Sequence, residues 1–419
     1  MQRALPLAFL VLSLTISGCA SGQSLTPNGK VAQPPVRPAT APEPVEVRPA
    51  NFTAWKTGFR PKALAAGVPA ATFDTAFQGV SVNERVLELD RFQPEFSRPI
   101  WEYLDSAVSP SRISNGKAKS AEYAQTLAAI EARYGVDSEV VVAIWGLESA
   151  YGANMGSIPV VESMATLAYD GRRRQFAEEQ LIAALKIIAR GDVPASRMIG
   201  SWAGAMGHTQ FIPTSFQDYA QDFTGDGRRD VWAANPSDAL ASTANYLARF
   251  GWTQGQPAVV EITLPQGFDY ALADQKIRKS VSEWRALGIA ATGVPEADAS
   301  VILPAGARGP AFLALPNFRV IKRYNNATSY ALAVAHLGAR IDGAGPFIAN
   351  WPRNDRALSR SEKEELQRRL TALGFDTQGA DGIIGPNSRA AVRAFQQANG
   401  ITPDGYVSGN LLDRVRGAG

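Results

Sequence analysis

Apolar positions are densest between Asp137 and Gly152, in the stretch DSEVVVAIWGLESAYG. They fill nearly every side of each turn, which predicts a helix buried all round rather than on one face. Asp137 is typical of an N-cap, and Gly152 is typical of a stop just past the last turn. The second half of this helix contains one carboxylate, Glu148. The pattern therefore places a single acid at the far end of a buried helix.

Shorter amphipathic stretches along the chain predict a mainly α-helical body. Helices are expected over residues 100–108, 121–134, 175–190, 239–250 and 329–337. The pattern of apolar and polar residues changes over residues 257–317. There VVEITL at 259–264 is typical of a strand, and a helix is expected over 273–287. The predicted fold class is mainly α (α+β), with this segment as a small α+β insertion.

A separate small helical unit is expected over residues 357–416, after a boundary rich in glycine, proline and polar residues at 343–355. A capping-box-like start at Ser361 leads into one helix, and Gly374 ends it. A second helix continues the apolar face through Phe395. The unit therefore has enough apolar residues for a core of its own.

Composition is that of an ordinary soluble protein, with 45% hydrophobic and 19% charged residues in 419. This length has room for two or three domains. The formal net charge of +3 is too small to indicate a nucleic-acid partner, although it suits a polyanionic surface or polymer. His208 and His336 are the only histidines, which argues against a histidine-based metal site or triad.

Residues 1–19 have the pattern of a lipoprotein signal peptide and are excluded from the fold. A positive start and an apolar run lead to Ile16-Ser17-Gly18-Cys19, which resembles a bacterial lipobox. Cys19 is the only cysteine, so no internal disulfide can form, and its thiol stands where lipid would be attached. The alternative is a signal peptide cleaved nearby, with Cys19 incidental. The apolar run is too short for a transmembrane anchor.

Ala20, rather than Asp, follows the cysteine, as in lipoproteins that Gram-negative cells send to the outer membrane. Residues 20–50 are rich in proline, alanine and serine, and predict a flexible tether. The expected location is the periplasm, with an acylated Cys19 inserted in the lipid of the outer membrane.

The residues alone allow two interpretations of Glu148. Apolar neighbours and the negative end of the helix dipole both disfavour its ionisation. A carboxylic acid kept protonated near neutral pH is suited to general acid catalysis. The structural alternative is a buried glutamate paired with an arginine.

Four separated blocks, spanning roughly Phe52 to Gly338, resemble the membrane-bound lytic transglycosylase B family. They are GLESAYG at 146–152, SWAGAMGHTQFIPTSF at 201–216, DFTGDG at 222–227 with the helix start at Asp238, and RYNNATSY at 323–330. The resemblance implies a lysozyme-like catalytic domain, over residues 51–345, that acts on peptidoglycan. Residues 357–416 resemble peptidoglycan-binding domain type 1, a three-helix bundle. An inert or protein-binding bundle is the alternative there.

The resemblance also implies a mechanism with one carboxylate. Glu148 would protonate the glycosidic oxygen between N-acetylmuramic acid and N-acetylglucosamine. It would then take the proton of the muramic C6 hydroxyl, which closes a 1,6-anhydro ring. Substrate would be held in a cleft lined by Tyr103, Ser201, Gln210, Phe211, Tyr246, Tyr324, Asn325 and Tyr330.

A glycosidase with two carboxylates needs the second about 5–10 Å from the first. The blocks around Glu148 offer no such partner, because Glu162 lies on a separate segment and Asp170 precedes three arginines. The N-acetyl group of the substrate would stabilise the charged centre in its place.

The loop that begins at Asp222 is typical of a degenerate EF-hand. Asp222, Thr224 and Asp226 alternate oxygen ligands before Gly227, and Arg228 would offer its carbonyl. The family resemblance implies that Asp238 closes a longer loop. We expect a structural calcium or sodium ion, with a metal-free Asx-turn loop as the alternative, and no cofactor for catalysis.

Three functions compete at this point. The first is a lytic transglycosylase, a carbon–oxygen lyase, with a wall-targeting module. The second is a hydrolytic muramidase on the same fold, which would release reducing muramic acid. The third is a catalytically dead wall-binding scaffold, against which the intact set around Glu148 argues. We predict the lytic transglycosylase, with peptidoglycan strands and cell-wall synthesis proteins as partners and no nucleic acid.

Overall fold

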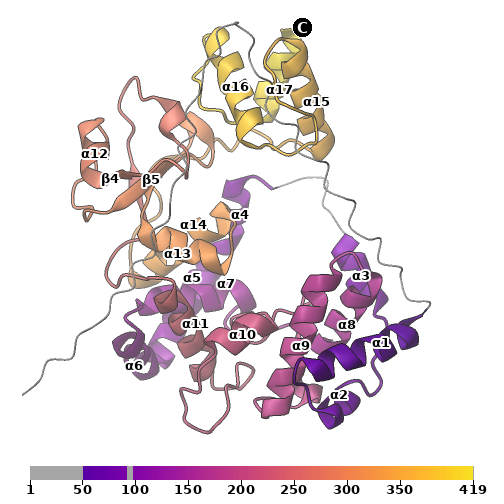
Figure 1. The fold of residues 1–419 in the computed structure, drawn as a ribbon. Helices are drawn as coiled ribbons and strands as arrows, with labels where there is room; N and C mark the ends of the chain where they lie inside the picture. The colour runs from indigo at the N-terminus through magenta and orange to yellow at the C-terminus, as the bar shows by residue number, and fades with distance from the viewer. Residues whose placement is uncertain (1–50, 92–97, 419) are drawn as a thin grey trace, which may run out of the picture. The chain divides into compact units, whose positions relative to one another are not determined.

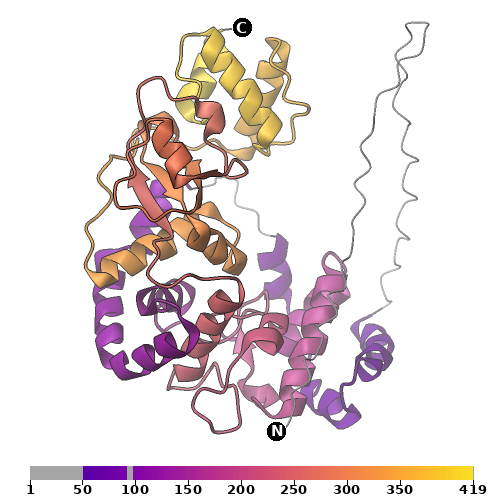
Figure 2. The same ribbon diagram turned by 60° about the vertical axis from the view of Figure 1, so that its left-hand side comes forward.

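The computed structural model describes residues 51–91 and 98–418, which form a mainly helical protein (Figure 1; Figure 2). The predicted signal peptide at 1–19, its Cys19 and the tether at 20–50 lie outside the described residues. Within the described part of the chain, no helix is long and apolar enough to cross a bilayer.

The helices of the described chain fall into three groups. Those before the insertion are α1 (Phe52–Ala65), α2 (Ala70–Ala76), α3 (Glu84–Arg91), α4 (Ile100–Ala107), α5 (Pro110–Glu122), α6 (Ala124–Tyr134), α7 (Ser138–Ser149), α8 (Val160–Asp170), α9 (Arg174–Arg190), α10 (Pro213–Tyr219) and α11 (Ser237–Arg249). The insertion contributes α12 (Val281–Ala286), and it is followed by α13 (Pro316–Tyr324) and α14 (Thr328–Asp342). The C-terminal unit consists of α15 (Arg360–Ala372), α16 (Pro386–Ala398) and α17 (Gly409–Gly417).

The strands form two sheets in the described residues. A two-stranded antiparallel ribbon pairs β1 (Ile158–Pro159) with β2 (Ile199–Gly200). The insertion has an antiparallel sheet of order β3-β6-β5-β4, made of β3 (Val259–Ile262), β4 (Lys279–Ser280), β5 (Asp298–Ile302) and β6 (Ala311–Ala314). The predicted insertion is therefore present as a small sheet with one short helix.

Helix α7 lies at the centre of the largest core, as its apolar pattern predicts. Its residues 140–146 are all buried, and it packs against α5, α6, α11 and α14. The helix ends at Ser149, before the predicted stop, because Ala150 and Tyr151 already adopt left-handed backbone angles with φ of 49° and 61°. Glu148 therefore stands in the last turn of the buried helix.

Asp137 occupies the N-cap position of α7, but it does not bond to the amides of the helix. Its carboxylate instead accepts hydrogen bonds from Trp252 Nε1 and from the amide of Gly255, each at 2.8 Å. Asp137 therefore connects α7 to the segment after α11 and does not cap the helix through its side chain. Tertiary donors outcompeted the local ones, because the indole of Trp252 is buried and needs an acceptor.

Three predicted helices differ from the structure by three or more residues at one end, and one of them, expected over 329–337, continues to Asp342 as α14. The helix expected over 121–134 starts at Ala124, because α5 precedes it and ends at Glu122. The helix expected over 273–287 starts only at Val281, after loop and strand β4. Ser280 and Glu283 form a capping box there, which fixes the start of α12.

The C-terminal unit has its own core, formed by Leu366, Leu370, Val392, Phe395 and Leu412 among others. The capping box at the start of α15 uses Ser359 with Glu362, not the predicted Ser361. The insertion likewise has a core that is separate from the one around α7. In the described residues, the helical body around α7, the insertion and the C-terminal unit thus each have a hydrophobic core of their own.

Candidate active site

Glu148 is held by a tyrosine from a distant helix. The Tyr330 hydroxyl, near the start of α14, donates a hydrogen bond of 2.6 Å to Glu148 Oε1. Burial raises the pKa of Glu148 to about 7, and the Tyr330 hydrogen bond lowers it in part. Desolvation wins because the apolar end of α7 cannot solvate a negative charge. The carboxyl group is therefore poised to exchange a proton near neutral pH.

The structural alternative of a glutamate paired with an arginine does not fit this environment. In residues 51–91 and 98–418, no lysine or arginine forms an ion pair with Glu148. The other two acids considered from the sequence are engaged elsewhere. Glu162 accepts a 2.6 Å hydrogen bond from Asn83 Nδ2, and Asp170 pairs with Arg91 at 2.5 Å. Neither contributes to the pKa shift of Glu148.

The negative charge of Glu148 acts on the hydroxyl groups of three tyrosines. Burial raises the pKa values of Tyr103, Tyr324 and Tyr330, and the negative charge of Glu148 raises them further. The Tyr324 hydroxyl donates to the carbonyl of Thr209, which ties the end of α13 to the segment after β2. The site thus combines one acid with protonated hydroxyl groups at neutral pH.

Phe211 and Tyr246 lie behind Tyr324 rather than at an open surface. Their side chains are 3% and 8% exposed, and the Tyr246 ring lies 5.1 Å from that of Tyr324. The Tyr246 hydroxyl donates to the carbonyl of Arg323 at 2.6 Å. These two predicted cleft residues therefore position Tyr324 and offer little surface to a sugar.

The segment from Ser201 to Gln210 is shaped by its own side chains. Ser201 Oγ accepts hydrogen bonds from the amides of Ala203 and Ala205, at 3.3 and 3.1 Å. Gln210 has a left-handed backbone, with φ of 53°, and its Nε2 donates to the carbonyl of Met155 at 3.2 Å. A strained backbone at a non-glycine residue is a common feature of functional sites.

Gly156 allows this segment to approach the chain that follows α7. It has φ of +87°, and a Cβ atom there would lie 2.1 Å from the carbonyl oxygen of Gly200. On the other side of the site, exposed Asn325 precedes α14, and its Oδ1 accepts the amide of Ala327 at 3.0 Å.

His208 is a positioning residue that the sequence reasoning missed. Trp145 Nε1 donates to His208 Nδ1 at 3.1 Å, so the remaining ring proton is on Nε2, which lies 2.8 Å from the carbonyl of Ala233. Ser149 Oγ donates to the His208 carbonyl at 2.6 Å. Burial lowers the pKa of His208, which keeps the ring neutral. The network joins the last turns of α7 to the loop before α11. A lone histidine in the sequence gave no signal of this role.

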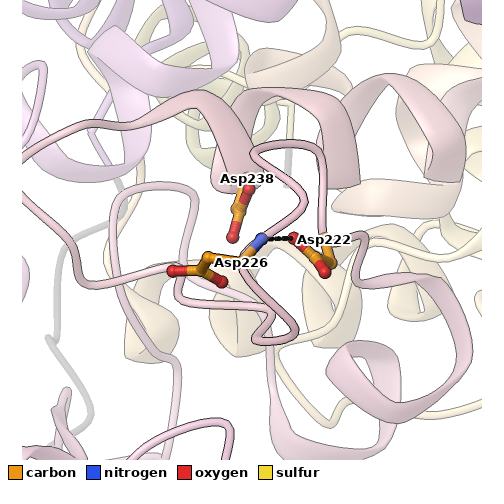
Figure 3. Close-up of side chains that lie close together, drawn as sticks. All are labelled: Asp222, Asp226 and Asp238. Atoms are coloured by element: carbon orange, nitrogen blue, oxygen red, sulfur yellow. Dashed lines mark hydrogen bonds between the residues drawn. The ribbon is translucent and has the colours of Figure 1, made fainter.

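The predicted metal loop brings three carboxylates together (Figure 3). Oxygen atoms of Asp222, Asp226 and Asp238 lie within 4.8 Å of one another. Asp222 also accepts the amides of the loop, and Asp238 accepts those of Phe223 and Thr224 at 2.9 and 3.0 Å. Of the other predicted ligands, Arg228 donates its amide to Asp226 at 2.9 Å.

No cationic side chain pairs with the negative charge of this cluster in the described part of the chain. No ion pair is formed there by Asp222, Asp226 or Asp238. Asp238 is 3% exposed, and burial raises its pKa. Carboxylate oxygens are the ligands that calcium prefers, and a bound cation would offset the cost of burying Asp238 in its ionised form. The residues present therefore fit a hard cation.

A cavity of about 350 Å³ lies elsewhere, lined by Leu104, His336, Phe347 and Trp351 among others. It includes neither Glu148 nor any of the three phenols. The cavity is consequently not part of the candidate active site.

Two family models match the chain. The model of the transglycosylase SLT domain matches residues 51–339, and PG_binding_1, the model of a peptidoglycan binding domain, matches residues 359–415. The membrane-bound lytic murein transglycosylase B of Escherichia coli is 33% identical over 248 residues. The match covers 57% of this chain and 66% of that protein, slightly less than two thirds of its length.

Solved structures resemble the chain as well. SltB3 from Pseudomonas aeruginosa, in complex with NAG-anhNAM-pentapeptide, is 54% identical with a TM-score of 0.84, over 88% of this chain and 100% of that one. SLT35 from Escherichia coli, in complex with calcium, is 29% identical with a TM-score of 0.60, over 68% of this chain and 92% of that one. The predicted fold class and family resemblance are confirmed: the chain belongs to the transglycosylase SLT domain family.

Proposed function

We propose that this protein is a lytic transglycosylase that cleaves the β-1,4 bond between N-acetylmuramic acid and N-acetylglucosamine. The observation that carries the proposal is Glu148, a single carboxyl group with a pKa of about 7, hydrogen-bonded to Tyr330. A group with this pKa is protonated often enough to act as an acid and ionised often enough to act as a base. One residue can then perform both proton transfers.

The reaction balances without water. Glu148 donates its proton to the glycosidic oxygen as the bond from that oxygen to C1 of muramic acid breaks. The C6 hydroxyl oxygen then forms a bond to C1, and its proton returns to Glu148. The products are a free N-acetylglucosamine hydroxyl and a 1,6-anhydro-muramic acid end. Glu148 finishes in its starting form, so no second carboxylate is required.

The names of the relatives support this assignment. The Escherichia coli relative is named a lytic murein transglycosylase, and the Pseudomonas aeruginosa structure holds an anhydro-muramic ligand. In the proposed site Tyr330 orients Glu148, and Tyr324 and Tyr103 complete the polar surface around the acid. Gln210, Asn325 and the turn closed by Ser201 would contact the glycan, while Phe211 and Tyr246 support Tyr324.

The identity of the product tests the proposal. Purified sacculi are incubated with the protein, and the released muropeptides are measured by mass spectrometry. We expect anhydro-muropeptides, which are lighter by one water than the hydrolysis products. Reducing muramic acid ends would instead assign a hydrolytic muramidase, and intact sacculi would assign a scaffold.

Replacing Tyr330 with phenylalanine should shift the pH profile of cleavage. Wild-type activity should fall as pH rises above about 7, because Glu148 then loses the proton it must donate. The Tyr330 hydrogen bond lowers the pKa of Glu148, so its removal should move this fall to higher pH. At pH 6 the rate should drop about tenfold, because the carboxyl group is less well oriented. The measurement is kcat/KM against pH.

The matched control is Tyr246→Phe, whose hydroxyl contacts the carbonyl of Arg323 and not Glu148. Its pH profile should keep the wild-type shape. A Tyr330→Phe profile that falls at the wild-type pH would contradict the role assigned to this hydrogen bond.

We further propose that the loop carries a structural calcium or sodium ion held by Asp222, Asp226 and Asp238, with Thr224 and Arg228 completing the site. The three neighbouring carboxylates and the buried Asp238 support this. The ion would supply positive charge that neutralises the loop, and it takes no part in proton transfer.

Excess chelator should therefore lower the melting temperature by several degrees while cleavage persists at lower temperature. Differential scanning calorimetry with and without added calcium measures the shift. The variant Asp226→Asn should melt at the same temperature in both conditions. A wild-type melting temperature that changes with neither chelator nor added calcium would contradict a calcium ion in the loop.

The C-terminal unit would bind peptidoglycan, which the PG_binding_1 match supports. The periplasm is the proposed compartment, with Cys19 acylated and anchored in the outer membrane, and cell-wall synthesis proteins as further partners. A Cys19→Ala variant expressed with labelled palmitate should lose the label and leave the membrane fraction. Label retained by this variant would contradict the lipobox assignment.

A further inference from the structure

We propose that a group of cationic side chains beside the active site binds the carboxylates of the peptide stems of peptidoglycan. We call it the cationic ledge and define it as Lys276, Arg278, Lys279, Arg319 and Lys322. The inference rests on the proposed function, because it concerns how the same substrate is recognised.

Two segments build the ledge. Arg319 and Lys322 are one turn apart on α13, and both side chains are partly exposed, whereas Phe318 and Ile321 are buried. The loop before β4 lies against this side, and Gln275 Oε1 in that loop accepts a 2.7 Å hydrogen bond from Lys322 Nζ. The amphipathic pattern of α13 thus leaves its cationic face to the insertion rather than to the core.

Like charges are brought together in the ledge. Burial, together with the positive charge of Arg278, lowers the pKa of Arg319. Arg319 Nη1 donates to the backbone carbonyl of Asp298 at 3.1 Å, and the Asp298 carboxylate offsets part of the repulsion. Asp274 uses one carboxylate oxygen to accept the amide of Lys276. Lys279 also interacts with the carboxylate of Glu283, so three acids accompany the five cations.

Several cationic side chains elsewhere in the described residues form ion pairs, whereas those of the ledge do not. Arg172 pairs with Asp90 and Arg229 pairs with Asp192, both at 2.7 Å. No ledge side chain forms an ion pair with a carboxylate of the described residues. A cluster of unpaired cations raises the local concentration of anions and is the natural partner of a carboxylate ligand.

The ledge is connected directly to the site around Glu148. Gln275, which accepts from Lys322, also donates through Nε2 to Thr328 Oγ1 at 2.8 Å. Thr328 begins α14, two residues before Tyr330, and Lys322 precedes Tyr324 by two residues on α13. Both tyrosines surround Glu148. One side chain, Gln275, therefore links the ledge to the helix that carries Tyr330.

The substrate has a short side branch. In peptidoglycan the muramic acid carries a short peptide on its lactyl group, and that peptide has free carboxylates. A glycan placed with its muramic acid at Glu148 would direct the peptide outward from the site. Anionic lipid is the competing partner for a cationic surface, but proximity to the acid favours the peptide.

Binding to a defined probe tests the ledge. The probe is a NAG-NAM-pentapeptide, compared with the same molecule whose carboxylates are amidated. Measurements use the full chain with Glu148→Gln, so that neither probe is consumed. We expect the free-carboxylate probe to bind about three- to tenfold more tightly, since exposed charge pairs each contribute modestly. Adding Lys276→Ala and Arg278→Ala should remove this difference, because both exposed side chains lose their charge.

The matched control removes two charges elsewhere, with Lys56→Ala and Lys186→Ala on α1 and α9. The control should keep the preference for free carboxylates. Equal weakening of both probes by the ledge variant, or no change in either, would overturn the proposal. The single change Arg278→Gln repeats the test if the double variant does not fold.

Two further readouts separate the possible failures. If sacculi yield reducing ends, the proposed reaction is wrong, while the probe preference still decides the ledge. Vesicles containing phosphatidylglycerol test the competing partner. Vesicle binding that is lost in the ledge variant, with probe preference retained, would assign the ledge to lipid and overturn the peptide proposal.

Discussion

Replacing Glu148 with glutamine should lower the rate of glycan cleavage by about 10³-fold or more, while binding to sacculi persists. Glutamine keeps the shape of the side chain and can still accept the Tyr330 hydrogen bond, but it has no acidic proton. General acid–base catalysis contributes about 10²–10⁴-fold, and here one residue supplies both proton transfers. The loss is measured as the yield of anhydro-muropeptides from sacculi. Binding is measured by co-sedimentation.

The chain offers a matched control on the same helix. Burial also raises the pKa of Glu139 to about 7, but Glu139 stands in the first turn of α7, far along the helix from Tyr330. Glu139→Gln should retain full activity. Loss of cleavage in both variants would mean that α7 depends on its buried acids for folding, and would remove the catalytic argument for Glu148.

The control variant also has an expected effect on stability. In the folded chain Glu139 titrates near pH 7, above its unfolded value of about 4.5. Its contribution to the free energy of unfolding is therefore fully present below pH 4.5 and is lost as pH rises through 7. Glutamine cannot ionise, so Glu139→Gln should be more stable than the wild type at pH 8, and the difference should vanish below pH 4.

Replacing Asp238 with alanine should lower the free energy of unfolding by about 3–5 kcal/mol. The buried carboxylate accepts the amides of Phe223, Thr224 and Asp230, and each donor left without a partner costs about 1–3 kcal/mol. The expected total lies below the sum because water reaches part of the loop. Urea denaturation in the presence of chelator measures the loss without any contribution from a bound ion.

Asp226→Ala is the matched control, because it removes another carboxylate of the same cluster. Asp226 is exposed and accepts one amide, that of Arg228. Its replacement should cost less than about 1 kcal/mol under the same conditions. Equal losses at the two positions would show that Asp238 does not organise the loop through its backbone contacts.

Features encoded by neighbouring residues could be predicted from the sequence. The helix α7 was identified because a nearly continuous apolar run of this length favours a buried helix over a strand, and this placed Glu148 at its far end. The expected rise in the pKa of Glu148 followed from the same pattern. The alternation of Asp222, Thr224 and Asp226 before Gly227 likewise located the acidic loop. In each case the information lies within about one turn or one loop of the chain.

Local signals were ambiguous where tertiary contacts compete with them. Asp137 has the residue type of a helix cap, yet it bonds to Trp252 and Gly255. The segment before α12 has helical composition, but strand pairing with β5 takes Lys279 and Ser280. The gain from tertiary partners exceeds the small differences in local propensity.

The sequence by itself determined the acid, the buried helix that carries it and the acidic loop, because these depend on residue type and short-range periodicity. Only the tertiary structure decided what surrounds the acid. Tyr330 lies 182 residues from Glu148, and the link through His208 joins residues 59 and 63 positions apart. The packing of α14 on α7 brings Tyr330 to Glu148, since burial of the apolar faces of the two helices fixes positions that no local pattern encodes.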